Sequence, residues 1–156
     1  KMTADEMRTA LLRTTFRYGK VNMGIHLGNI THGEFTTLQM VHMYRKKHPG
    51  EYGIGVSELA RCSYMSPPAM SRTLKAVEEK GLAERRVDSQ NRRKTYVRLT
   101  PEGENARQHA WRMCTDYINR VIEEMGEEKM ETFLALWEEM VDLMEKNIPM
   151  FYEEPS

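Results

Sequence analysis

The residues best placed to do chemistry in this sequence are six cationic side chains packed into the fourteen positions from 85 to 98. They are Arg85, Arg86, Arg92, Arg93, Lys94 and Arg98. The intervening run, Asp88-Ser-Gln-Asn91, has the composition of a tight turn, so part of this charge lies at the tip of a hairpin. An ordinary solvated turn does not need so many cations. Guanidinium and ammonium groups in this arrangement suit contacts with the phosphate oxygens of a polyanion.

The charge of the chain is divided along its length although its net charge is zero. Residues 1–55 carry 8 Lys or Arg against 4 Asp or Glu, and residues 56–100 carry 10 against 5. Residues 101–156 carry 5 against 14. A basic first part joined to an acidic last part favours a polyanionic partner for the first part only.

A helix just before the basic hairpin presents a second set of candidate residues. Ser66 caps this helix, Pro67 occupies its first position, and Gly81 follows its end. A buried stripe at helical spacing consists of Met70, Leu74 and Val77. The outward set is then Ser66, Pro68, Ala69, Ser71, Arg72 and Lys75.

These outward side chains have the chemistry to contact DNA base edges and phosphates. Arg72 can donate to guanine or to phosphate, Ser71 can serve base or backbone, and Pro68 and Ala69 can touch thymine methyl groups. A solvated helix face in a protein-interaction module would look similar from this helix alone. Together with the basic hairpin, the pattern favours nucleic acid.

The elements around this helix complete a winged helix-turn-helix at about residues 34–100. A short helix carrying Leu59, Ala60 and Cys62, with Ser57 as its cap, precedes a tight turn at residues 63–65. After Gly81 the period of apolar residues changes to two, which predicts a two-stranded hairpin over about 82–99.

Helices flank this unit on both sides. Thr3 and Glu6 form a capping box at the start of a helix within about 3–28, and a second helix fits residues 34–48. A glycine-rich loop at 50–55 leads into a short strand. Two long helices occupy about 100–148, one running from Thr100-Pro101 to Gly126 and the other ending before Pro149. The predicted fold class is mainly α with a small β-hairpin, in a single domain spanning 1–156.

The flanking helices carry more apolar surface than one small winged helix can cover. Residues 106–144 contain two apolar stripes with Trp111, Trp137 and several methionines. Packing against a twofold-related copy would bury this surface, and the two recognition helices would then lie ~34 Å apart on a palindromic site. We therefore expect a homodimer that pairs through this last third of the chain.

Several other classes of protein lack support in the sequence. The nucleophile-elbow, P-loop and zinc-protease motifs are absent, so we expect neither an enzyme nor a cofactor. No stretch approaches the ~18 uncharged apolar residues of a membrane span, and the N-terminal residues do not resemble a signal peptide, so the expectation is a soluble, cytoplasmic protein. Cys62 and Cys114 are expected to be reduced thiols of the core or of an interface, and Cys62 is expected to be a buried thiol of the helix-turn-helix. The five histidines show no pair at positions i and i+4, so no metal site is expected.

The combined motifs resemble the MarR (multiple-antibiotic-resistance regulator) family over nearly the whole chain. The resemblance lies in Val56-Ser-Glu-Leu-Ala60, Ser66-Pro-Pro-Ala-Met-Ser-Arg-Thr-Leu74 and Glu78-Glu-Lys-Gly-Leu82. Its most specific part is Arg86-Val-Asp-Ser-Gln-Asn-Arg-Arg93 followed by Val97-Arg-Leu-Thr-Pro-Glu-Gly103. It implies a homodimeric transcription regulator with dimerisation helices at about 3–28 and 100–148, expected to be a repressor that binds a palindromic operator in double-stranded DNA.

The resemblance also implies roles for individual residues. Arg93 takes the position of the wing arginine that enters the minor groove, and Arg92 and Lys94 flank it. The family commonly has Asp two residues before that arginine, where this chain has Asn91, whose amide offers Arg93 only a neutral hydrogen bond. A small-molecule effector that releases DNA is expected between the dimerisation helices and the winged helix. Candidate lining residues are Tyr18, His42, Met43, Trp111 and Met113.

Two alternatives remain at this point. The resembled family includes metal and redox sensors, and Cys62 lies next to the basic helix, where cations could activate a thiol. The winged helix could also bind protein instead of DNA, with the wing cations recognising an acidic partner. Neither the operator, the effector nor the direction of regulation follows from the sequence.

Overall fold

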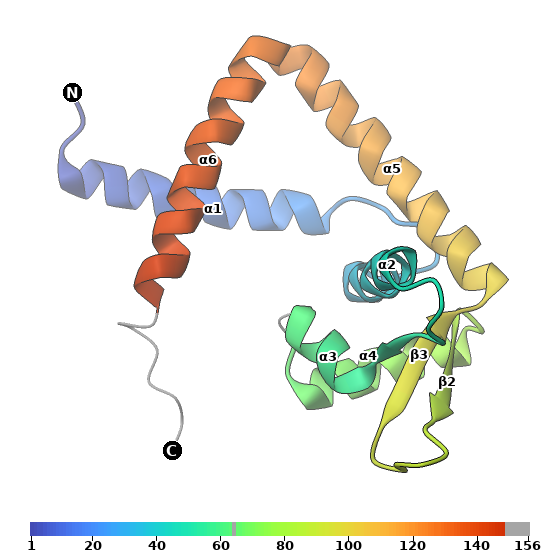
Figure 1. Cartoon of the computed structure of the whole chain (residues 1–156). Coiled ribbons are helices and arrows are strands. Elements are labelled where there is room, and N and C mark those ends of the chain that lie inside the picture. Colours follow the sequence, from blue (N-terminus) through green and yellow to red (C-terminus); the bar gives the residue numbers. More distant parts are fainter. Residues whose placement is uncertain (64, 149–156) are drawn as a thin grey trace. The chain divides into compact units, whose positions relative to one another are not determined.

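The computed structural model describes residues 1–63 and 65–148 (Figure 1). The chain divides into two compact units, Lys1–Cys114 and Thr115–Ser156. Tyr64 in the predicted turn and Pro149 after the predicted last helix lie outside the described residues. None of the described helices is long and apolar enough to cross a membrane.

The order of elements follows the prediction and confirms a mainly helical fold with one small sheet. The chain runs through α1 (Ala4–Met23), α2 (His32–Lys47), β1 (Ile54–Gly55), α3 (Val56–Cys62), α4 (Pro67–Glu79), β2 (Ala83–Val87), β3 (Thr95–Leu99), α5 (Pro101–Met125) and α6 (Glu127–Asn147). The predicted capping box at Thr3 and Glu6 starts α1. Helix α5 begins in the first unit and ends in the second.

The sheet is antiparallel, with strand order β1-β3-β2 among the described residues. Ala83 lies opposite Leu99 at the start of the β2–β3 hairpin, and Val87 lies opposite Thr95 near its turn. Ile54 of β1 pairs with Val97 of β3. Gly53 allows this pairing, because a Cβ there would lie 1.9 Å from the carbonyl oxygen of Val97.

The core of the first unit is built from the helix-turn-helix and the sheet. Met70, Leu74 and Val77 of α4 are fully buried, as predicted from their spacing. They share one cluster with Leu38 and Val41 of α2 and with other buried residues, which are Leu27, Ile30, Ile54, Leu59, Ala60, Ala83, Val97 and Ala110. Burial of such side chains contributes ~1.5–3 kcal/mol each, so this cluster holds α4 and the hairpin in place.

Three local predictions were wrong. Ser57 does not cap α3, because the strand runs directly into the helix and Gly55 takes the cap position without a side-chain hydrogen bond. The second helix begins two residues before Glu34, since Thr31 is its cap and Glu34 completes a capping box. Cys62 is exposed instead of buried because it lies on the outer side of α3, whereas Leu59 and Ala60 face the core.

Helices α1 and α6 differ from α4 in having no buried residue. Large apolar side chains of α1 are open to solvent, and Leu12 and Phe16 are each 72% exposed. In α6, Leu136 is 62% and Met144 58% exposed. Helix α6 therefore carries part of the surplus apolar surface that the sequence predicted for residues 106–144, and α1 adds exposed apolar surface of its own.

Candidate nucleic-acid interface

Helix α4 presents its first turns to solvent while its inner side is locked into the core. The Ser66 hydroxyl accepts a hydrogen bond from the backbone N–H of Ala69 at 3.3 Å, and Pro67 occupies the first turn. Unpaired N–H groups and the positive end of the helix dipole therefore face outward at this end. Such a helix end suits contact with phosphate and with base edges in a groove.

The predicted readers of α4 lie on its exposed side. Ser66, Pro68, Ser71, Arg72 and Lys75 are exposed, and Ala69 is partly exposed. Lys75 reaches only a weak 4.0 Å contact with Glu79. Arg72 forms no ion pair with any residue that the structure describes, so its guanidinium is available to a ligand.

The turn of the hairpin is shaped by two short polar side chains. Asp88 Oδ1 accepts hydrogen bonds from the backbone N–H groups of Gln90 and Asn91, at 2.8 and 3.3 Å. The hydrogen bond from the Gln90 backbone is the main reason that the pKa of Asp88 lies below its usual range. Asn91 Oδ1 accepts from the backbone N–H of Arg93 at 3.1 Å. The amide thus orders the backbone before Arg93.

The end of the hairpin carries three exposed cations, which we call the wing tip: Arg92, Arg93 and Lys94. None of them forms an ion pair with another described residue. Arg93 and Lys94 line a groove of about 440 Å³, together with Tyr44 of α2 and Ser57 of α3. In Figure 1 the loop between β2 and β3 extends away from the helices of the winged helix. The wing tip is thus positive and open.

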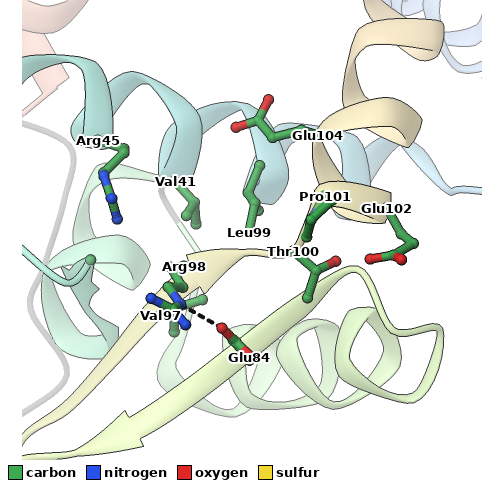
Figure 2. Close-up of a pocket in the computed structure, with 11 residues that line it drawn as sticks. Val41, Arg45, Glu84, Val97, Arg98, Leu99, Thr100, Pro101, Glu102 and Glu104 are labelled. Atoms are coloured by element: carbon green, nitrogen blue, oxygen red, sulfur yellow. Dashed lines mark hydrogen bonds and ion pairs between the residues drawn. The ribbon is translucent and has the colours of Figure 1, made fainter. Parts of the chain in front are cut away.

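The other three arginines of the hairpin, Arg85, Arg86 and Arg98, form the wing base and bind protein groups. Arg85 donates two hydrogen bonds to the Glu78 carboxylate of α4, at 2.6 and 2.8 Å. Arg98 pairs across the strands with Glu84, its register partner (Figure 2). The hydrogen bond with Glu84 raises the pKa of Arg98.

Tyr52 completes the wing base from the loop before β1. The guanidinium carbons of Arg86 and Arg98 lie 4.6 and 4.5 Å from the centre of its ring. Its backbone carbonyl accepts a hydrogen bond from Arg45 of α2 at 3.0 Å. Tyr52 therefore joins both wing strands to α2. It was absent from the predicted site, since nothing local to the loop marks it.

The predicted effector residues do not gather in one described cavity. Tyr18, Met43 and Trp111 are exposed, whereas His42 and Met113 are partly buried. His42 Nδ1 lies 2.9 Å from Glu104 Oε1, and Arg107 Nε lies 3.0 Å from Glu104 Oε2. Burial raises the pKa of Glu104, but the hydrogen bonds from His42 and Arg107 outweigh it and lower the pKa overall.

Four described cavities are lined by other residues. The cavity in Figure 2, about 420 Å³, lies between α2, the sheet and the start of α5, with Arg45, Glu102 and Glu104 at its edge. Another, about 680 Å³, is lined by residues that include Leu27, Leu82, Lys80 and His109.

The described residues contain no group of three or more His, Cys, Asp or Glu side chains that could hold a metal ion. Cys114 is partly buried, and burial raises the pKa of its thiol. Neither cysteine is in a disulfide.

Comparison with known proteins agrees with this geometry. The MarR family model matches residues 30–95, which hold the helix-turn-helix and most of the hairpin. No curated protein sequence matches the chain.

Solved structures share the fold at low sequence identity. A cysteine-to-serine mutant of MarR from E. coli, complexed with operator DNA, is 17% identical, with a TM-score of 0.72 and coverage of 89% of this chain and 99% of that one. A MepR-DNA complex from S. aureus is 19% identical, with a TM-score of 0.69 and coverage of 91% and 98%. PcaV from Streptomyces coelicolor, in complex with its natural ligand, is 14% identical, with a TM-score of 0.70 and coverage of 90% and 98%. The resemblance to the MarR family drawn from the sequence is therefore confirmed: the family model matches residues 30–95, and the solved structures share the fold over most of the chain.

Proposed function

We propose that this chain is a transcription regulator that binds double-stranded DNA in a sequence-specific manner. The observation that carries the proposal is the combination, in one compact unit, of an exposed α4 N-terminus with an unpaired cationic wing tip. Helix α4 would enter the major groove, with Ser66, Pro68, Ala69, Ser71, Arg72 and Lys75 facing DNA. The wing tip, Arg92, Arg93 and Lys94, would contact phosphates and the adjacent minor groove.

The similar structures in complex with DNA support this proposal by their fold. E. coli MarR and S. aureus MepR both appear bound to DNA. In this chain the proposed contact residues of α4 and the wing tip are exposed, apart from Ala69, which is partly exposed.

The regulator would act as a homodimer on a palindromic operator. Helices α1 and α6 have no buried residue, and Phe16 and Leu136 are among their most exposed side chains. Exposed apolar helix faces of this kind mark an interface. A second copy fits best, because a twofold axis would bury the same surface on both chains and would pair two recognition helices.

We further propose that the dimer represses transcription and releases DNA when a small molecule binds. PcaV in complex with its natural ligand supports this, because that protein has a similar fold. The candidate lining residues remain Tyr18, His42, Met43, Trp111 and Met113. A single MarR-like domain spanning 1–156, with dimerisation helices at about 3–28 and 100–148, would place them beside the winged helix.

Selection of bound sequences from random duplexes tests DNA binding and symmetry together. The expected result is a palindromic consensus, with an affinity that falls steeply as salt concentration rises. Fluorescence anisotropy on the selected duplex and on a scrambled duplex then gives the specificity ratio. Equal, salt-insensitive affinity for both duplexes, with capture of an acidic protein partner instead, would favour the protein-interaction alternative.

Sedimentation of variants in α1 tests the dimer. Leu12→Gln with Phe16→Gln should shift the protein toward monomer and weaken operator binding, because both side chains are largely exposed in one chain. Arg13→Gln in the same helix is the matched control and should remain dimeric. A folded wild-type monomer at nanomolar concentration would contradict the homodimer.

The sensor alternative is tested by titrating operator binding with peroxide and with zinc. We expect no change, since the histidines and cysteines do not form a ligand cluster among the described residues. A shift of ~10-fold or more in affinity would revive it, and Cys62→Ser would show whether the exposed thiol is responsible.

A further inference from the structure

Helix α4, strand β2 and helix α5 meet at the C-terminal end of α4. Helix α4 ends in a Schellman motif, in which Gly81 has φ of +72°. The N–H of Leu82 donates to the carbonyl of Val77 at 2.8 Å, and the N–H of Gly81 donates to that of Glu78 at 2.9 Å. Strand β2 starts directly afterwards at Ala83.

Thr100 connects this point to the start of α5. Its backbone N–H donates to the carbonyl of Leu82 at 3.1 Å. Its hydroxyl donates to the carbonyl of Gly81 at 2.6 Å and accepts from the backbone N–H of Gly103 at 3.0 Å. One hydroxyl therefore caps α5 and binds the end of α4. Figure 2 shows Thr100 next to Pro101, where α5 begins.

Gly103 permits this close approach. It is buried, and a Cβ at this position would lie 1.8 Å from the carbonyl oxygen of Leu82. Any larger residue would push the first turn of α5 away from the end of α4. This explains physically why the Leu-Thr-x-x-Gly pattern at residues 99–103 has threonine and glycine at these positions.

The end of α4 is also held from α2. Lys80 Nζ donates to the Asn29 carbonyl at 2.9 Å and to Glu34 Oε1 at 2.8 Å. Glu34 is 4% exposed and belongs to the capping box that starts α2. Burial raises the pKa of Glu34, but the hydrogen bonds from Lys80 and Thr31 outweigh it, so this pKa lies below its usual range. At the opposite end of α4, Ser66 caps the helix and Met70 is buried in the core.

We propose that Thr100 and Gly103 are positioning residues that fix the direction of α4 relative to α5, and so the distance between the two recognition helices of the dimer. This proposal rests on the proposed function. Since α4 packs into the core of the winged helix and α5 begins at this junction, a small change of angle at the junction becomes a larger displacement at the first turn of α4, which lies at the far end of the helix. The junction should therefore set how strictly the protein selects the spacing of two half-sites.

Three substitutions at Thr100 separate positioning from helix capping. Thr100→Ser keeps both hydrogen bonds of the hydroxyl. Thr100→Asp keeps an acceptor for the Gly103 N–H but has no proton to donate to Gly81. Thr100→Val loses both. The experiment measures thermal stability and the anisotropy-derived affinity for the selected operator, with and without one base pair inserted between the half-sites.

Wild type and Thr100→Ser should discriminate sharply against the inserted base pair. Thr100→Asp should melt within a few degrees of wild type. Its ratio of affinities for the normal and the lengthened operator should nevertheless be ~3- to 10-fold smaller, which is the equivalent of one hydrogen bond. If Thr100→Val fails to fold, the Asp and Ser variants still decide. Unchanged spacing discrimination in a folded Thr100→Asp protein would overturn the junction proposal alone. Failure of wild type to bind any duplex would overturn the proposed function as well.

Discussion

The two halves of the wing use the same kind of residue in different ways. At the wing base, Arg85 and Arg98 are paired with Glu78 and Glu84, and Tyr52 lies against two guanidinium groups. At the wing tip, Arg92, Arg93 and Lys94 make no ion pair with described residues. The charge of the base holds the hairpin to the body of the protein. The charge of the tip stays available to a ligand.

Because of this difference, fewer cationic side chains are available to bind DNA than the hairpin contains. A paired guanidinium has its donors occupied and its charge compensated, so it contributes less to counterion release from a duplex. An unpaired guanidinium on a rigid support contributes more, because less entropy is lost when it binds. The wing base therefore strengthens binding by the wing tip, because it holds the hairpin rigid. The contributions of base and tip can be separated experimentally.

The largest effect is expected when the wing tip is neutralised. Changing Arg92, Arg93 and Lys94 together to Gln should weaken binding to any duplex by ~100-fold or more. The salt dependence should flatten by roughly one unit of slope for each phosphate that the variant no longer neutralises. The melting temperature should hardly change. Anisotropy at several salt concentrations measures the affinity and the slope.

The matched control is the same exchange at the wing base, with Arg85, Arg86 and Arg98 changed to Gln. Since these side chains contact Glu78, Glu84 and Tyr52, this variant should have a clearly lower melting temperature and a smaller loss of DNA affinity than the wing-tip variant. Equal salt slopes for the two triple variants would remove the distinction between base and tip.

A smaller and more selective loss is expected at α4. Arg72→Ala should cost ~1–3 kcal/mol on the selected operator and less on random duplex, because Arg72 is exposed on the part of α4 that we propose faces base edges. The specificity ratio should therefore narrow. Lys75→Ala, on the same face but farther from the first turn, is the control and should weaken both duplexes alike. A uniform loss for Arg72→Ala would assign that residue to the phosphate backbone.

Substitution of Tyr52 should have a modest effect, mainly on stability. Tyr52→Leu keeps an apolar side chain but removes the aromatic face that two arginines contact. We expect a melting temperature ~2–4 °C lower and only a small loss of DNA affinity. Scanning calorimetry and anisotropy check this pair of results. A large affinity loss without destabilisation would mean that Tyr52 itself touches DNA.

The sequence predicted the backbone of this arrangement well. Met70, Leu74 and Val77 have helical spacing, Ser66 and Gly81 bound their helix, and the change of period after Gly81 marks the hairpin. All of these signals are local, since each depends on residues within a few positions of one another. They were enough to place the recognition helix and the wing.

What the sequence could not reveal was the set of interactions between residues that are far apart in the chain. The pairing of Arg98 with Glu84 depends on strand register across fourteen positions, and the packing of Tyr52 against Arg86 depends on how a loop folds back. The outward position of Cys62 depends on the exact start of α3, which Gly55 and not Ser57 sets. Cations of the base and tip therefore looked equivalent.

The smallest effect is expected at Asn91, the position where the resemblance to the MarR family implies an aspartate. In the structure its Oδ1 accepts from the backbone N–H of Arg93 at 3.1 Å, and its carbonyl accepts from the N–H of Lys94 at 2.9 Å. A carboxylate could keep the first of these bonds, which would be stronger because the acceptor is charged, and could also hold the Arg93 guanidinium. The same carboxylate would repel phosphate.

Asn91→Asp should therefore weaken binding to random duplex, where charge dominates, and change the selected operator by no more than ~3-fold, because a better aimed Arg93 offsets the repulsion. The ratio of operator affinity to random-duplex affinity should therefore stay the same or rise. Asn91→Ala removes the acceptor without adding charge. It should lower affinity for the operator more than for random duplex, since the backbone at Arg93 is no longer held in place. Both variants are measured by anisotropy alongside Arg93→Ala. If Asn91→Asp loses as much operator affinity as Arg93→Ala, the added charge outweighs any ordering of the tip, and Asn91 serves this wing by being neutral.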